Sequence, residues 1–211
     1  MRKYILSIFL FINSIFVGTA QNNADAERLI DNFIHTVQSE AIRTDFRVII
    51  SEKNAVNSQQ ISGTLILKDK RFYLETDEIQ VWFDGKTQWA YMKDDNEVSI
   101  TEPTDEELAE TNPVSILTTF KKASKIQFSK TKNHANYVVE MIPKGKNATF
   151  SRVEVQLVKA SGNLFSIHID QKNGSKNKFM LTNYQRKALI NQCTFTFDKT
   201  KFKGLVINDL R

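Results

Sequence analysis

Cysteine and histidine are scarce in this chain, and no catalytic motif accompanies them. Cys193 is the one cysteine among 211 residues, so no disulfide can form within the chain, and we interpret its thiol as buried and inert rather than reactive. The three histidines, His35, His134 and His168, lack the spacing and the cysteine neighbours of a metal site. A Gly-x-Ser-x-Gly nucleophile motif is also missing. These absences predict no metal, no cofactor and no catalytic residue, and they argue against an enzyme.

Long apolar runs are confined to the N-terminus. Arg2 and Lys3 precede an uncharged, mostly apolar run from Tyr4 to Val17, and Gly18-Thr19-Ala20 follows it. This is the pattern of a secretory signal peptide, and the run is too short for a comfortable membrane span. We expect cleavage after Ala20 and export of residues 21–211 as a single domain. An uncleaved anchor is the alternative.

The excess of positive charge is small. The formal net charge is +5, and loss of Arg2 and Lys3 leaves 27 basic residues against 24 acidic ones, a net charge of +3. Such an excess favours brief approach to an anionic lipid surface. It does not indicate a nucleic acid, which an exported protein would not meet.

Hydrophobic periodicity and residues typical of helix starts together predict three helices. Apolar residues recur at spacings of three and four from Asp25 to Ile42, as in an amphipathic helix. A cap at Thr104 followed by three acids predicts a helix from Thr104 to Thr111. Pro113 in a first turn predicts another from Pro113 to Phe120.

Elsewhere the period of two predicts strands joined by short turns, which are typical of antiparallel neighbours. The chain shows no βαβ rhythm, repeat or linker. We therefore expect a mainly β, α+β fold: an unclosed antiparallel β-barrel, or strongly curved sheet, with the N-terminal helix and the mid-chain helix pair as a lid. The expected strands are Asp45–Ser51, Gln60–Lys68, Arg71–Glu75, Gln80–Phe83, Thr87–Met92, Glu97–Thr101, Ile126–Lys130, Asn136–Pro143, Val153–Lys159, Leu164–Asp170, Lys176–Tyr184 and Thr194–Phe197.

One predicted hairpin is apolar on both faces. If Asp84-Gly85 forms a two-residue turn, Trp82 faces Thr87 and lies diagonally from Trp89. One face then carries Trp82, Trp89 and Tyr91, and the other carries Val81, Phe83, Ala90 and Met92. A sheet with two apolar faces is either covered on both sides or lines a cavity. The sequence leaves open a plain hydrophobic core and a cavity for an apolar ligand.

Five segments of the chain carry a resemblance to a known family. They are GTLILKDKRFYLET, VWFDGKTQWAYMKDDNEVSI, NPVSILTTF, VEVQLVKASGNLFSIHIDQKNGSKNKFMLTNY and FTFDKTKFKGLVINDLR. Their most specific part is Asp-Gly-Lys-x-x-Trp-x-Tyr from Asp84 to Tyr91. Through them the chain resembles the LolA family of periplasmic outer-membrane lipoprotein carriers over nearly all of residues 21–211. The resemblance implies an unclosed β-barrel with helices over a hydrophobic cavity, no enzymatic activity and no cofactor.

The resemblance also implies partners. A monomeric periplasmic carrier would take the acyl chains of lipoproteins from an inner-membrane ABC transporter and pass them to an outer-membrane acceptor or to the membrane itself. The lipid-anchored acceptor of the same fold has a cysteine after its signal peptide, which this chain lacks. A lipid-sensing periplasmic regulator and a lipid-modifying enzyme are the alternatives. The first would need a further partner-binding domain, and the second would need converging polar groups in the cavity.

The expected cavity lining combines the family's strand positions with a choice of which face points inward. We expect the sheet to contribute Leu65, Leu67, Phe72, Leu74, Trp82, Trp89, Tyr91, Phe165, Ile167 and Phe179. A one-residue slip would replace Trp82 by Phe83. We expect the lid to contribute Phe33, Val37, Ile116, Leu117 and Phe120.

Two basic residues are candidates for lid closure and release. Many family members have a basic residue followed by proline before the aromatic strand, and that residue is associated with holding the lid shut. The matching position here is Lys68, and Arg71 is a second candidate. Lysine cannot make the forked contacts that arginine makes with carbonyl groups.

Overall fold

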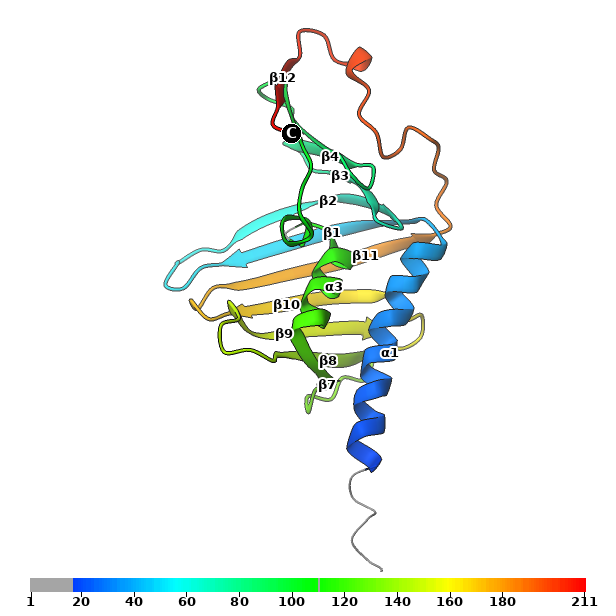
Figure 1. Ribbon diagram of the computed structural model, residues 1–211, viewed down its shortest axis with the longest axis vertical. Coiled ribbons are helices and arrows are strands. Elements are labelled where there is room, and N and C mark those ends of the chain that lie inside the picture. The colour runs from blue at the N-terminus through cyan, green and yellow to red at the C-terminus, as the bar shows by residue number, and fades with distance from the viewer. Residues whose placement is uncertain (1–16, 110) are drawn as a thin grey trace, which may run out of the picture.

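Twelve strands form one curved sheet in the computed structural model (Figure 1), which describes residues 17–109 and 111–211. The order across the sheet is β12-β6-β5-β4-β3-β2-β1-β11-β10-β9-β8-β7. All neighbours are antiparallel except β12, which runs parallel to β6. The strands are β1 (Ile42–Ser51), β2 (Gln59–Lys68), β3 (Arg71–Glu75), β4 (Ile79–Phe83), β5 (Gln88–Met92), β6 (Glu97–Thr101), β7 (Ser124–Phe128), β8 (Asn136–Pro143), β9 (Phe150–Val158), β10 (Leu164–Gln171), β11 (Lys176–Arg186) and β12 (Val206–Asp209).

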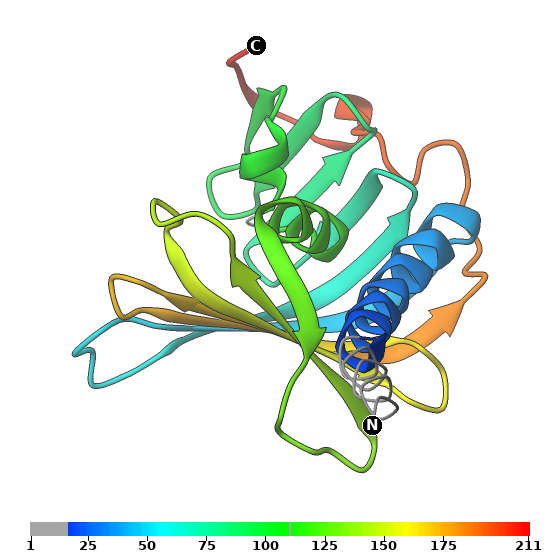
Figure 2. The same ribbon diagram turned by 60° about the horizontal axis from the view of Figure 1, so that its bottom comes forward.

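Helices α1 (Val17–Ser39) and α3 (Pro113–Ala123) lie inside the curve of the sheet (Figure 2). The short helix α2 (Asp105–Leu108) precedes α3, and a 3₁₀ turn η1 (Lys199–Lys201) lies in the C-terminal segment. Helix α1 already includes the predicted cleavage site after Ala20. The expected signal peptide otherwise falls almost wholly outside the described residues and stays a prediction. Within the described ranges, no helix is both long and apolar enough to span a membrane.

The residues at the start of α2 and α3 explain why both helices begin where they do. The Thr104 side chain accepts a hydrogen bond from the Glu107 N–H, and the Glu107 carboxylate accepts one from the Thr104 N–H at 2.7 Å. This reciprocal pair is a capping box. At α3, the Asn112 side chain accepts from the Val114 N–H at 2.9 Å, and Pro113 occupies the first turn.

The predicted fold class is confirmed, with differences at some boundaries. Helix α1 ends at Ser39 rather than Ile42, because Ile42 begins β1 and pairs with Leu67. The predicted strand Thr194–Phe197 is wrong, because those residues form turns rather than a ladder with another strand. β12 was not predicted, and its four residues are all exposed, so no alternation of buried and exposed positions marks it.

One continuous apolar core fills the concave side of the sheet. Residues spaced three or four apart along α1 are buried in this core, including Ala26, Ile30, Phe33 and Val37. The sheet supplies alternate residues from both of its halves, since successive side chains in a strand point to opposite faces. Those fully or nearly fully buried are Ile42, Phe46, Leu65, Leu67, Phe72, Leu74, Val81, Phe83, Val139, Met141, Val153, Val155, Leu157, Leu164, Ile167, Ile169, Phe179 and Leu181.

A second apolar cluster lies on the convex face of β2–β6, beneath the C-terminal segment. Phe197 and Phe202 stack at 4.9 Å between ring centroids, and Phe197 meets the edge of Trp82 at 5.3 Å. Phe202 also lies 4.5 Å from Tyr91. We call this the outer cluster: Ile66, Tyr73, Trp82, Trp89, Tyr91, Val98, Phe195, Phe197 and Phe202. It explains why both faces of the β4–β5 hairpin are apolar, because each is covered.

Candidate functional site

The concave face and the two helices above it bring together most of the residues predicted to line a cavity. From the sheet, Leu65, Leu67, Phe72, Leu74, Ile167 and Phe179 belong to the concave core. From the helices, Phe33, Val37, Ile116 and Leu117 belong to it, and the half-buried Phe120 packs against it. Phe120 meets the edge of Phe150 on β9 at 4.7 Å, so α3 contacts the far half of the sheet directly.

The inward direction predicted for Trp82, Trp89 and Tyr91 is wrong. Trp82 pairs with Tyr73 and with Trp89, whereas Phe72 pairs with Phe83 on the opposite face. The three residues therefore belong to the outer cluster, and Phe83, Val81 and Ala90 take their places in the concave core. Hydrophobicity could not decide between the faces, because residues 195–202 cover the outer one.

The turn of this hairpin also differs from the prediction. Phe83 pairs with Gln88, so four residues, Asp84 to Thr87, connect the strands instead of two. The Asp84 carboxylate accepts hydrogen bonds from the N–H groups of Lys86 and Thr87 at 2.9 and 2.8 Å. This local bonding stabilises the wider turn. Trp82 is consequently directly opposite Trp89 rather than diagonal to it.

Two further residues differ from the sequence-based expectation. Phe165 lies where the pairing of β9 and β10 is irregular, between Leu164 and Ser166, and it is half-buried outside the concave core. The bulge interrupts the alternation on which its assignment depended. Cys193 was expected to be buried but is exposed, because its segment forms turns over the outer cluster.

Among the described residues, the side chains that form the concave core are apolar, and no chemistry-bearing group belongs to it. His168 lies between Ile167 and Ile169, which both point inward, so its ring is on the convex face. Burial and the neighbouring Lys178 lower the pKa of His168, so it is uncharged at neutral pH. No group of three or more metal-ligating side chains occurs in the part of the chain that the structure describes.

Concave apolar residues that were not predicted come mainly from the second half of the sheet. Val153, Val155 and Leu157 on β9 alternate with polar residues, which was a usable signal. Phe46 is harder to assign because it lies opposite Gly63, and only the pairing of β1 with β2 identifies its face.

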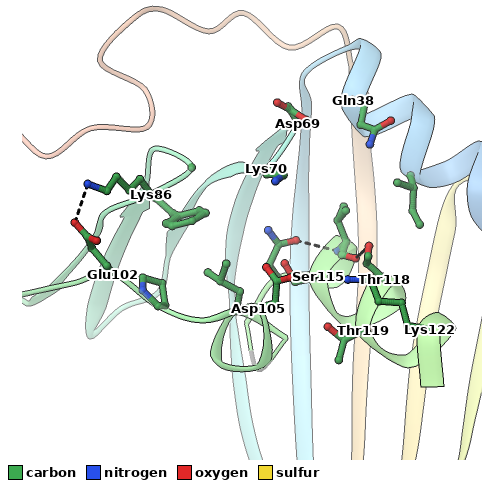
Figure 3. Close-up of a pocket in the computed structure, with 17 residues that line it drawn as sticks. Gln38, Asp69, Lys70, Lys86, Glu102, Asp105, Ser115, Thr118, Thr119 and Lys122 are labelled. Carbon is green, nitrogen blue, oxygen red and sulfur yellow. Dashed lines mark hydrogen bonds and ion pairs between the residues drawn. The ribbon is translucent and has the colours of Figure 1, made fainter. Parts of the chain in front are cut away.

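A cavity of about 500 Å³ opens at the rim between α1, the α2–α3 pair and the turns of β2–β3 and β4–β5 (Figure 3). Its lining combines the apolar Ile34, Phe83, Leu108 and Val114 with polar and charged side chains. Lys86 pairs with Glu102 there at 3.2 Å. Fully buried side chains such as Phe33 and Leu117 fill the deeper concave space, and this cavity is open at its rim.

Comparison with known proteins identifies the family. The model described as "Outer membrane lipoprotein carrier protein LolA" matches residues 16–175. The chain belongs to the LolA family. The resemblance seen in the sequence is thereby confirmed, and the family's description is that of a carrier rather than of an enzyme.

Several solved structures are similar to this chain at low sequence identity. An uncharacterized conserved protein from Thermus thermophilus has a TM-score of 0.56 at 9% identity, over 88% of this chain and 99% of that one. A putative outer membrane lipoprotein-sorting protein domain from Vibrio parahaemolyticus has a TM-score of 0.45 at 12% identity, over 83% and 97%. A LolA superfamily protein from Nitrosomonas europaea has 0.46 at 9%, over 82% and 98%. No curated protein matches the sequence.

Lys68 and Arg71, the two candidates for lid closure in this LolA-family chain, contact different parts of the protein. The Lys68 ammonium donates to the Gln38 carbonyl at 2.8 Å, and the Asp69 N–H donates to the Val37 carbonyl at 2.9 Å. Both bonds satisfy carbonyls at the C-terminal end of α1. The Arg71 guanidinium instead lies 5.0 Å from the centre of the Phe195 ring on the convex face. Its contact is therefore with the C-terminal segment and not with a helix of the lid.

An ion pair joins α3 to α1 across the concave side. The Lys121 ammonium lies 3.1 Å from the Glu27 carboxylate and 2.5 Å from that of Asp31. Burial alone would lower the pKa of Lys121, but the hydrogen bonds to Asp31 and Glu27 outweigh it and raise the pKa. Lys121 therefore stays charged and holds the two helices together.

We expect substitution of Lys121 by glutamine to loosen α3 without unfolding the protein. An ion pair of this exposure contributes up to about 1 kcal/mol, so an acyl ligand that needs α3 displaced should bind about threefold more tightly. Titration with a fluorescent fatty acid at low and high salt measures the effect, which should shrink at 1 M salt. Lys125→Gln, an exposed change on β7, is the matched control and should leave binding unchanged.

Substitution of Phe202 by alanine tests the assignment of the outer cluster. The ring contacts Tyr91, Trp82 and Phe197 on the convex face, so its loss should lower the free energy of unfolding by roughly 2 kcal/mol. Tryptophan emission should shift to the red, because Trp82 becomes hydrated. Fatty-acid affinity should not change, and a large loss of affinity would contradict the placement of this cluster outside the binding space.

Proposed function

We propose that this protein is a periplasmic carrier that takes up the acyl chains of lipoproteins and moves them from the inner to the outer membrane. The observation that carries the proposal is the concave face, which is apolar along both halves of the sheet and is roofed by α1 and α3. Family membership supports it. In this proposal residues 1–20 direct export, and residues 21–211 act as one carrier domain without catalytic residues or cofactor.

The helices occupy the space that acyl chains would use. Leu117 and Ile116 of α3 are nearly fully buried against the sheet, so acyl chains enter when the α2–α3 pair swings outward. Closing α3 on the empty protein keeps the large apolar face away from water. Cargo replaces one set of apolar contacts by another, and the exchange is therefore close to balanced.

A balanced exchange is what a carrier requires. Each methylene moved from water to an apolar site contributes about 0.8 kcal/mol, so three long chains would exceed the ~20 kcal/mol at which non-covalent affinity saturates. A protein that bound them so strongly could not release them. Displacing Leu117, Ile116 and Phe120 from the sheet opposes uptake and favours release to an acceptor.

The partners in this proposal are membrane-bound. An ABC transporter of the inner membrane would load the carrier, and an outer-membrane acceptor or the membrane itself would receive the cargo. Lys68 would position the end of α1 at the rim of the open cavity, and Lys121 would hold α3 until cargo displaces it.

Mass spectrometry of the protein purified from its own periplasm tests the proposal. Acylated peptides or lipoproteins should co-purify with the wild-type protein and be lost from Leu65→Asp, which places a charge on the concave face. Depletion of the protein should leave lipoproteins at the inner membrane. Turnover of an ester substrate, or a protein that carries no acylated species when its lipoproteins are present, would refute the carrier function.

A further inference from the structure

Charge is distributed very unevenly along the chain. Residues 21–110 contain 9 basic and 19 acidic residues, whereas residues 111–211 contain 18 basic and 5 acidic ones. Within residues 124–186, which form β7–β11, 11 basic residues accompany only three acids. The β7–β11 half of the sheet therefore has an excess of eight positive charges (11 − 3), although the net charge of the whole chain is small.

The three acids of the β7–β11 half gather around one arginine. Glu140, Glu154 and Asp170 all surround Arg152, whose guanidinium lies 3.4, 4.0 and 3.0 Å from their carboxylates. In the part of the chain that the structure describes, no other basic residue of this half pairs with these carboxylates, and Arg186 pairs with Glu40 instead. The positive charge of this half therefore exceeds what its own acids could balance.

Five exposed lysines gather at one end of the sheet, where three loops meet (Figures 1 and 2). The loops are residues 52–58, 144–149 and 172–175, and they project together from the same end in both views. We call these lysines the basic row: Lys53, Lys144, Lys146, Lys172 and Lys176. Among the described residues, none of the five takes part in an ion pair.

Backbone and side-chain contacts join the three loops into one surface. The Lys172 ammonium donates to the Lys146 carbonyl at 2.6 Å, and the Lys172 N–H donates to the Thr149 carbonyl at 2.8 Å. The Lys53 side chain lies against Gly174, where a Cβ atom would be 2.6 Å from its Cδ. The row is therefore held by the fold, and its charges add at one place.

We propose that the basic row is a docking surface for the anionic headgroups of a phospholipid membrane. Lysine ammonium groups on flexible stems suit a surface of many diffuse phosphates better than a single shaped site. Val56, at the tip of the 52–58 loop, is 98% exposed, and an apolar side chain beside lysines is suited to the boundary between headgroups and acyl chains. A protein partner with an acidic surface would not need this apolar tip.

Docking through the basic row leaves the open cavity accessible. The cavity is lined by the β2–β3 and β4–β5 turns, at Lys70 and Lys86 among others. In an antiparallel sheet these turns lie at the opposite end of the strands from the 52–58 loop, which joins β1 to β2. A membrane at the basic row would therefore hold the carrier near its source or destination with the cavity rim still free.

Flotation of the mature protein with lipid vesicles tests the docking surface. We expect binding to vesicles of 30% phosphatidylglycerol in phosphatidylethanolamine, weaker binding as salt rises, and little binding to phosphatidylcholine vesicles. Each lysine contributes about fivefold in affinity, so K53Q/K146Q/K176Q should weaken binding roughly 100-fold. The matched control K199Q/K201Q/K203Q makes the same change of charge in the C-terminal segment and should bind like the wild type. Val56→Ser should weaken binding severalfold without altering the salt dependence.

Several outcomes would overturn the docking surface. These are equal binding to both kinds of vesicle, equal loss in the control triple variant, and unaltered binding in K53Q/K146Q/K176Q. Failure of the wild type to float, combined with row-dependent crosslinking to an acidic protein in cells, would assign the surface to that protein instead. All variants change exposed side chains, and thermal melting confirms that each remains folded. The proposed carrier function is tested separately, by whether the protein binds acyl chains.

Discussion

Leu117→Ala is expected to bind fatty acid roughly 30-fold more tightly than the wild type while being less stable by about 2–5 kcal/mol. Leu117 is fully buried in the empty protein, where it packs from α3 into the concave core. In the proposed loaded state α3 is displaced from the sheet, so the substitution removes a contact that belongs to the empty state alone. If the empty state loses about 2 kcal/mol of stabilisation that the loaded state never had, the affinity for fatty acid rises roughly 30-fold.

Leu67→Ala is the matched control for this result. Leu67 is also fully buried in the concave core, but it lies on β2 within the sheet, which the proposed opening of α3 leaves in place. Its replacement should lower stability by a similar amount without tightening binding. Chemical denaturation and a fluorescent fatty-acid titration measure the two quantities. If both variants shift affinity equally, α3 does not act as a lid.

Gly63→Ala should be the most damaging change of a single methyl group in the sheet. A Cβ at Gly63 would lie 1.9 Å from the Glu75 carbonyl oxygen and 3.0 Å from the Phe46 ring. Because one obstacle is backbone, the strands must move apart, and we expect a loss of roughly 3 kcal/mol in the free energy of unfolding. Glycine is required here for the close approach of β3 to β2.

Gly145→Ala is the control for this prediction. Gly145 is exposed, and a Cβ there would meet nothing within 4 Å. The free energy of unfolding should change by less than about 0.5 kcal/mol. Urea denaturation of both variants compares them directly. Equal stability of the two would show that the sheet opens at Gly63 more easily than its geometry indicates.

Much of the architecture was predictable because alternation and turn residues are local signals. The ranges Arg71–Glu75, Glu97–Thr101 and Asn136–Pro143 are each a predicted strand with matching bounds. The cap at Thr104 and the proline at Pro113 correctly marked two helix starts. These features depend on neighbours within a few residues, which the sequence displays in order.

The inward face of the β4–β5 hairpin was not predictable by the same means. Trp82 and Phe83 are equally suited to burial, and which one points to the concave core depends on Phe197 and Phe202, more than a hundred residues away. Arg71 likewise contacts Phe195, and not the lid, through the same C-terminal segment. That segment has no strand-like or helix-like period to show where it packs.

Composition and local sequence patterns by themselves determined a mainly β chain with an N-terminal helix and a mid-chain helix pair, no internal disulfide and no catalytic motif, since these properties depend on residue type and local spacing. Tertiary structure alone decided which apolar face is concave, that α3 fills the concave space, and that five lysines from one end of the sheet form one surface. Those outcomes require residues distant in the chain to meet, and their meeting is set by the pairing of β1 with β11 and by the path of residues 187–211.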